Sequence, residues 1–486
     1  MPCSGALGAL ILLLTLMQST PQSASAADPW ICIHSANFEL YTTAGEKTGR
    51  EALLVFEEIR TAFRDILGVK FPENKPVTIV AFRDEQEYAP YRVHAGAFAY
   101  YMPLPRRDLI VMQDLLPEHY PMVLHEYTHL VINQAGMKLP LWLNEGFAEM
   151  YSTLKPIGRE IRVGRIIPAR LQMAEAGLID LRDILNADAH SKLYNESDRM
   201  GIFYAESWAL VHMLKFSKAY SPGFERFLDD IGRGDPSDQA LEKVYGKPIE
   251  AIQTDLQAYV HGEHFYEGVI HAKLGKPNVE LVVMPKDALE TAVMLAGIKS
   301  RGTHRAEALK TLEQLATANP GKPAPLEALA WVHLTGSDPQ SATEPFRRAL
   351  EAGTRDANLC FSYAVKLRAF IPGADYLAAL RRATEIDPEF SAAQQLLAAY
   401  AFNTRDYREA VTRLHLVKKL DRARAFSYYR ALAFAAFQIG QATEARSAAN
   451  RAQQYASTDE EHRLADEITR YVTGASPPLK PPELPQ

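Results

Sequence analysis

The sequence predicts an α+β domain, with a small mixed sheet plus helices, followed by an all-α solenoid of helical repeats. Two observations support this fold class. Up to about residue 270, short β-rich apolar runs alternate with segments of helical periodicity. Beyond about residue 290, small and large apolar residues recur roughly every 34 residues. With 486 residues, 47% of them hydrophobic, the chain is long enough for two or three domains that each bury a core.

The N-terminus has the pattern of a secretory signal peptide. An apolar run at residues 6–17 is followed by polar residues and by Ala24-Ser25-Ala26, a small-x-small cleavage pattern. We therefore expect residues 1–26 to be a signal peptide and the mature chain to be exported, without a stable membrane span. No Lys or Arg precedes the apolar run, so a retained anchor is the alternative, although twelve residues fall short of a bilayer about 30 Å thick. A net charge of −6, with acidic and basic residues nearly balanced, gives no reason to expect nucleic acid as a partner.

The first domain is expected over residues 28–270. It opens with a strand at 37–43, where Phe38 and Leu40 alternate with polar residues. A helix is expected over 46–67, because its apolar residues cover one face. Further strands are expected at 77–82 and 109–112. Helices are expected at 122–134, 143–154, 202–216, 225–231 and 249–261. Gly and Pro residues interrupt the helical pattern near residue 270, so residues 271–289 are expected to be a linker.

An internal repeat occupies residues 290–472. One helix position recurs at steps of 34, 34, 34 and 35 residues, at Ala308, Ala342, Tyr376, Ala410 and Ala445. Four residues later come Leu312, Phe346, Leu380, Leu414 and Ala449. This period and register resemble the tetratricopeptide repeat, which implies paired antiparallel helices stacked into a solenoid. Tyr376 stands where a small residue is expected, and an Ala-rich bundle without solenoid geometry is the alternative. A Pro-rich disordered tail is expected over residues 473–486.

A His-Glu-x-x-His motif, His125-Glu126-Tyr127-Thr128-His129, lies within an apolar helical segment. Residues four apart lie on the same face of a helix, so both imidazoles can reach one ion. A catalytic Zn²⁺ site takes three protein ligands and leaves one position for water. Glu126 would lie beside that position, where it can take a proton from the water and deliver it to a leaving amine. The motif therefore predicts one Zn²⁺ per chain and a third ligand downstream.

The motif, together with the segment LWLNEGFAE at 141–149, resembles the gluzincin zinc metallopeptidases, which include thermolysin-like and aminopeptidase N-like enzymes. The resemblance implies a zincin-like fold for residues 28–270. It also implies that Glu145, after fifteen intervening residues, is the third zinc ligand, and that Glu149 orients a zinc-bound His. Residues 37–262 further resemble the peptidase MA-like domain found ahead of tetratricopeptide repeats in bacterial envelope proteins. That resemblance implies a periplasmic or secreted protein.

Two further candidates come from the same resemblance. Tyr204 is similar to the Tyr that donates to the oxyanion in aminopeptidase N-like enzymes, and packing in the core is the alternative. Gly96, Ala97 and Phe98 stand where gluzincins have an edge strand that binds the substrate backbone. The chain lacks the GAMEN sequence with which aminopeptidases capture a free amino terminus. The resemblance therefore does not extend to exopeptidase action.

The remaining Cys and His residues have no metal-ligand spacing. Cys32 and Cys360 are expected to be buried free thiols, and an interdomain disulfide is the alternative. His94, His119 and His212 are expected to be capping residues or satisfied core residues.

The expected function is that of a zinc-dependent hydrolase, namely a metallo-endopeptidase acting on a protein or peptide. Its repeat domain is expected to bind a substrate or a partner protein. Two alternatives stay open at this point. In one, the repeats form an interaction scaffold and the zinc domain is slow or inactive. In the other, the zinc site hydrolyses a non-peptide amide or ester of the cell envelope.

Overall fold

The computed structural model describes residues 30–67, 77–94, 96–104, 107–157, 160–262, 265–271, 280–284, 287–418, 420, 422–475, 479 and 481. These residues are mostly helical, with small sheets and a series of helical repeats. The chain divides into two compact units that interleave along the sequence. The first unit comprises Met1–Arg83, Asp114–Tyr120 and Leu139–Pro285, and the second comprises Asp84–Gln113, Pro121–Lys138 and Lys286–Gln486. The expected signal peptide, residues 1–26, lies outside the described residues.

The first unit contains four neighbouring strands of a mixed sheet, in the order β3-β2-β1-β9. Their bounds are β1 Ile31–His34, β2 Phe38–Thr42, β3 Val77–Ala81 and β9 Val282–Met284. Strands β2 and β3 are parallel, and helix α1 (Glu46–Leu67) makes the crossover that a parallel pair requires. The predictions for β2, α1 and β3 are confirmed. The expectation that residues 271–289 form a linker is wrong for β9, which pairs with β1 in antiparallel fashion.

Helices make up most of the rest of the first unit. They are α4 Leu141–Ser152, α5 Pro168–Ala176, α6 Leu181–Asn186, α7 Lys192–Asn195, α8 Ser197–Phe216, α9 Phe224–Arg233, α10 Ser237–Tyr245 and α11 Ile249–Val260, with 3-10 turns η2 Pro117–His119 and η3 Ser221–Gly223. A three-stranded sheet accompanies them, formed by β6 Lys155–Ile157, β7 Glu160–Val163 and β8 Gly268–His271. Helix α8 is central, and α4 lies close against it. A Cβ added to Gly146 would lie 2.5 Å from the carbonyl oxygen of Ser207, so the approach of the two helices depends on Gly at this position.

The second unit contains the hairpin of β4 (Ala99–Pro103) and β5 (Asp108–Met112), which pair in antiparallel fashion. A short helix α2 (Glu85–Tyr88) and a 3-10 turn η1 (Ala89–Tyr91) precede the hairpin. Helix α3 (Tyr120–Gln134), which carries the His-Glu-x-x-His motif, follows it. Every side chain of β5 is buried.

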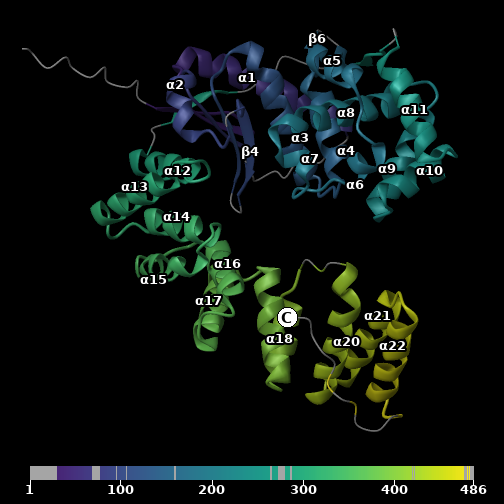
Figure 1. Cartoon of the computed structure of the whole chain (residues 1–486). Helices are drawn as coiled ribbons and strands as arrows, with labels where there is room; N and C mark the ends of the chain where they lie inside the picture. The colour runs from purple at the N-terminus through teal and green to yellow at the C-terminus, as the bar shows by residue number, and fades with distance from the viewer. Residues whose placement is uncertain are drawn as a thin grey trace, which may run out of the picture. The chain divides into compact units, whose positions relative to one another are not determined.

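Helical repeats form the remainder of the second unit. They comprise α12 Ala288–Lys299, α13 Arg305–Ala318, α14 Pro323–Leu334, η4 Pro339–Ala342, α15 Thr343–Glu351, α16 Ala357–Leu367, α17 Gly373–Ile386, α18 Ser391–Asn403, α19 Tyr407–His415, α20 Arg422–Gln438, α21 Ala442–Tyr455 and α22 Asp459–Val472. Successive helices pack against one another in the green-to-yellow part of Figure 1. The Ala residues at the small repeat position are fully buried, at Ala308, Ala342, Ala410 and Ala445. This region is therefore a tetratricopeptide-like helical repeat, as its period predicts.

The departure at Tyr376 is accommodated at the surface of α17. Its ring is half-buried, and the guanidinium carbon of Arg368 lies 5.5 Å from the ring centroid. The expected tail, residues 473–486, lies largely outside the described residues. Within it, Leu479 packs against the last hydrophobic cluster of the repeats, which includes Phe434 and Val472.

Both cysteines of the expected mature chain are buried, as predicted, and Cys360 is a free thiol. Burial raises the pKa of the Cys360 thiol to about 12. Among the helices that the structure describes, none combines the length and apolar character needed to cross a membrane.

Candidate metal centre

Two imidazoles converge on one face of α3. The Nε2 atoms of His125 and His129 lie 3.1 Å apart, and the two rings meet edge-on with centroids separated by 4.8 Å. Two nitrogens bound to a tetrahedral zinc ion at about 2.0–2.1 Å are separated by roughly 3.3 Å. The helix therefore presents its two nitrogens at nearly the separation that one zinc ion requires.

Glu145 supplies the third donor. Its side chain is 3% exposed on α4. One ligand atom from each of His125, His129 and Glu145 lies within 4.8 Å of the others. No other group of three His, Cys, Asp or Glu side chains in the described part of the chain has this arrangement. Two imidazole nitrogens and one carboxylate oxygen form a donor set that fits a catalytic zinc ion.

Glu126 lies between the two His residues and faces the hairpin. Its Oε2 atom accepts a hydrogen bond of 2.8 Å from the backbone N–H of Tyr101, in β4. A backbone donor favours the ionised form of a carboxylate and fixes its direction. Glu126 is therefore held as an oriented acceptor next to the His pair.

Glu149 is buried one turn after Glu145, and it is paired with Arg170 at 2.7 Å. The same guanidinium lies over the ring of Tyr204, with its carbon 5.2 Å from the ring centroid. Arg170 thus contacts both Glu149, which is expected to orient a zinc-bound His, and Tyr204, which is expected to donate to the oxyanion. That Glu149 orients a His and that Tyr204 acts on the oxyanion both stay predictions.

Tyr194 is a residue that the sequence did not single out. Its hydroxyl donates a hydrogen bond of 3.1 Å to Oε1 of Glu145. Its ring contacts Phe203 and Tyr204 edge-on, with centroid distances of 5.8 and 6.2 Å. Tyr194 lies in a four-residue helix with no motif, so the only available signal was an aromatic residue just ahead of the helix expected at 202–216.

The expected edge strand is displaced along the chain. Gly96, Ala97 and Phe98 precede β4, which begins at Ala99. The carbonyl of Ala97 accepts a hydrogen bond from the Tyr88 hydroxyl, and that of Phe98 accepts one from the backbone of Gln113. Substrate binding along this segment stays a prediction, and the strand available for it is β4.

Helix α8 carries two buried ionisable groups, Glu206 and His212, whose hydrogen-bond partners lie outside the candidate metal site. Burial raises the pKa of Glu206 to about 8, although a hydrogen bond from the backbone N–H of Ile179 opposes the rise. Burial lowers the pKa of His212 to about 4. Its ring nitrogens contact the carbonyl of Gly164 at 2.6 Å and the hydroxyl of Tyr259 at 2.7 Å. His212 is therefore a satisfied core residue, as predicted.

The other two single His residues differ from each other. Nδ1 of His119 lies 2.7 Å from the carboxylate of Asp114, close to the start of α3. The contact gives one ring nitrogen of His119 a partner, and the capping role stays a prediction. His94 is exposed.

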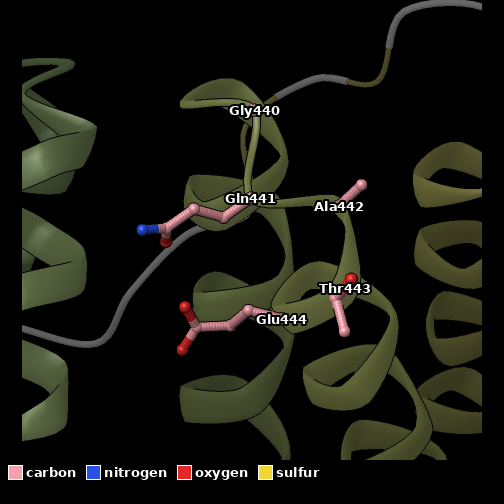
Figure 2. Close-up of a pocket in the computed structure, with 5 residues that line it drawn as sticks. All are labelled: Gly440, Gln441, Ala442, Thr443 and Glu444. Atoms are coloured by element: carbon pink, nitrogen blue, oxygen red, sulfur yellow. The ribbon is translucent and has the colours of Figure 1, made fainter.

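An open depression occurs at the turn between α20 and α21. Gly440, Gln441, Ala442, Thr443 and Glu444 line it, and Figure 2 shows the side chains of Gln441 and Glu444 extending to the same side of the turn. Glu444 is paired with His415 there. The lining has no convergent set of ligands, so the depression offers no second metal centre.

Comparisons with known proteins add little to this description. No protein-family model matches the chain, and no curated protein matches it. One solved structure that matches is YrrB, described as a TPR protein with an unusual peptide-binding site. The sequences are 17% identical, the match covers 38% of this chain and 94% of YrrB, and the TM-score is 0.29. The tetratricopeptide-like assignment of the repeats rests on their own period, helices and buried positions.

Proposed function

We propose that this protein is a zinc-dependent hydrolase, specifically a metallo-endopeptidase that binds one zinc ion per chain. The observation that carries the proposal is the convergence of His125, His129 and Glu145, with Glu126 placed between the two His residues. The donor set and the intervening carboxylate together match the requirements of metal-assisted hydrolysis. The resemblance to gluzincins favours a peptide bond as the target.

The residues of the chain have distinct tasks in this reaction. A zinc ion bound by the three ligands would polarise the substrate carbonyl and acidify a water molecule. Glu126 accepts a proton from that water molecule as the water oxygen attacks the carbonyl carbon. Glu126 then delivers the proton to the leaving amine as the C–N bond breaks. The hydrogen bond from the Tyr101 backbone N–H holds the Glu126 side chain in one orientation for both proton transfers.

The repeats support a second candidate function, that of an interaction scaffold. They form a solenoid with hydrophobic cores of their own, and such solenoids commonly bind proteins. Under the main proposal, the repeats bind the substrate or a partner protein. Under the alternative, binding is the whole function.

Zinc content and hydrolysis separate these functions. We expect one zinc ion per chain by elemental analysis, and cleavage of an unfolded protein that stops on chelation. Glu126→Gln should keep the zinc and lose turnover, whereas His125→Ala should lose both. Glu118→Gln, at an exposed carboxylate near α3, is the matched control and should behave as wild type.

Three outcomes would contradict the proposal in different ways. A chain without zinc would favour the scaffold. Zinc without peptide cleavage would favour hydrolysis of a non-peptide amide or ester. Full activity in Glu126→Gln would exclude the proposed role of that carboxylate.

We also propose that the protein is exported to the bacterial envelope, on the pattern of residues 1–26. Cell fractionation with N-terminal sequencing of the purified chain tests this. A mature N-terminus near Ala27 is expected, and an intact Met1 in the cytoplasmic fraction would contradict it.

A further inference from the structure

The hairpin of β4 and β5 contacts both the motif helix α3 and the first helical repeat, which α12 and α13 form. We infer that the first repeat acts as a positioning element for Glu126, and that the hairpin transmits its position. This inference rests on the proposed function, because it assigns a catalytic consequence to the repeats. Under this inference the repeats contribute to catalysis by positioning Glu126, even when no partner is bound to them.

The first link joins the hairpin to α3. The backbone N–H of Tyr101 donates to Glu126 at 2.8 Å, and Asn133, two turns further along α3, donates to the Tyr101 hydroxyl at 2.9 Å. That hydroxyl itself donates to Asp108, at the start of β5, at 2.7 Å. Gln134 donates to the other oxygen of Asp108 at 2.8 Å. Three of these hydrogen bonds join the hairpin to the motif helix, and the fourth, from Tyr101 to Asp108, joins the two strands of the hairpin.

The second link joins the hairpin to the turn η1. The hydroxyl of Tyr100, the residue before Tyr101, donates to the carbonyl of Tyr91 at 2.8 Å. The hydroxyl of Tyr88 donates to the carbonyl of Ala97 at 2.8 Å, just before β4 begins. Segment 88–91 thus bonds to β4 and to the residues just before it, so a shift of this segment would displace Tyr100 and the adjacent Tyr101 together.

The third link joins η1 to the first repeat. Helix α12 packs against η1, and the turn that follows α12 brings Gly302 against the residue after η1. A Cβ added to Gly302 would lie 2.4 Å from the carbonyl oxygen of Arg92, a distance that real Cβ contacts do not show. Just before β5 begins, Arg107 pairs with Glu290 of α12 at 3.1 Å. The repeat therefore meets the hairpin region at two places.

The three links form one continuous path from the repeat to the carboxylate. It runs from Gly302 through η1 to Tyr100, and then through the Tyr101 N–H to Glu126. Protein interiors are close-packed, so a displaced backbone segment moves its neighbours. A misplacement of about 1 Å at a catalytic group can reduce a rate by roughly 100-fold. A disturbance confined to the repeat should consequently reach the reaction.

Gly302→Ala and Gly297→Ala form a matched pair that tests this path. Neither glycine has a positive φ, so alanine is compatible with both backbones. The added Cβ at position 302 meets the Arg92 carbonyl, whereas at position 297, within α12, it meets nothing within 4 Å. The added Cβ therefore disturbs the contact with Arg92, the residue after η1, in Gly302→Ala but not in Gly297→Ala.

We expect a lower kcat and faster hydrogen–deuterium exchange in β4 for Gly302→Ala, and neither effect for Gly297→Ala. Its kcat on an unfolded protein substrate should fall about tenfold, with KM within about twofold of wild type and one zinc ion retained. Hydrogen–deuterium exchange of the amides at 99–103 should be several-fold faster than in wild type. Gly297→Ala should match wild type in each measurement.

Wild-type kcat and wild-type exchange in a folded Gly302→Ala protein would overturn the inference. If Gly302→Ala does not fold, Tyr100→Phe removes only the hydroxyl that bonds to Tyr91, and it should also accelerate exchange at Tyr101 and lower kcat. Unchanged exchange and kcat in Tyr100→Phe would then overturn the inference. A wild-type protein without hydrolytic activity would refute the proposed function, while the exchange measurement would still decide whether the repeat positions β4.

Discussion

The buried carboxyl of Glu206 makes the stability of the first unit depend on pH in a defined direction. Its side chain is 0% exposed in α8, and Oε2 accepts a hydrogen bond of 2.8 Å from the backbone N–H of Ile179. Burial disfavours the charged form and raises the pKa from 4.5 to about 8. Between these values the folded chain keeps a proton that the unfolded chain releases. Stability should therefore fall as pH rises from about 4.5 through about 8.

The perturbation is Glu206→Gln, which keeps the shape and the acceptor for Ile179 but cannot ionise. One pKa unit corresponds to about 1.4 kcal/mol of free energy. The difference in the free energy of unfolding, variant minus wild type, should consequently rise by roughly 4 kcal/mol between about pH 5 and about pH 8.5. His212 has the opposite sign, because its pKa is lowered to about 4 and its contribution is lost as pH falls. The subtraction cancels that contribution, since both proteins carry His212.

The assay is urea unfolding at several pH values, in the presence of a chelator so that metal binding does not contribute. Fluorescence of Trp142 and Trp208, both fully buried in the first unit, reports on the relevant part of the chain. Glu225→Gln, at an exposed position, is the control and should show no trend with pH. A difference between Glu206→Gln and wild type that stays constant from about pH 5 to about pH 8.5 would refute the assignment of a buried, protonated Glu206.

Three further predictions concern the metal site, the core and the thiols. Tyr194→Phe should weaken zinc binding about 10- to 100-fold in chelator competition, because its hydroxyl orients Glu145. Tyr204→Phe should leave zinc affinity unchanged. Equal losses of zinc affinity in Tyr194→Phe and Tyr204→Phe would contradict the role of the Tyr194 hydroxyl. Gly146→Ala should destabilise the chain by about 1–3 kcal/mol, because α4 and α8 must separate, and a melting temperature equal to that of the open-space control Gly232→Ala would contradict the packing. Cys360 should react with a thiol reagent only after denaturation, since burial raises its pKa to about 12, and rapid labelling of the native chain at this position would be inconsistent with the structure.

Much of the local structure could be predicted from sequence periodicity. The helix at 46–67 has the expected bounds, because an amphipathic repeat of apolar residues reports directly on one buried face. The spacing of His125 and His129 likewise implies a shared helix face, which α3 shows. The repeat period also predicted which Ala positions are buried between helices.

Strand β9 could not be predicted, because it is only three residues long and its partner β1 lies some 250 residues earlier in the chain. The bond from the Tyr101 backbone to Glu126 depends on where two elements pack, and a backbone N–H leaves no trace in the sequence. Tyr194 belongs to a short helix without a motif, so only its position beside Glu145 reveals it.

The sequence by itself thus predicted many of the element types and the helical repeat, because these follow from periodicity. The pair His125 and His129 followed from a spacing of about one helical turn, whereas Glu145 followed only from the resemblance to gluzincins. The tertiary structure alone decided which groups support those ligands and which ionisable side chains are buried. The shifted pKa of Glu206 and the contact of Gly302 with Arg92 are examples of this second kind. Both depend on packing between residues that are distant along the chain, which excludes water from Glu206 and brings Gly302 against Arg92. No local sequence pattern encodes such packing.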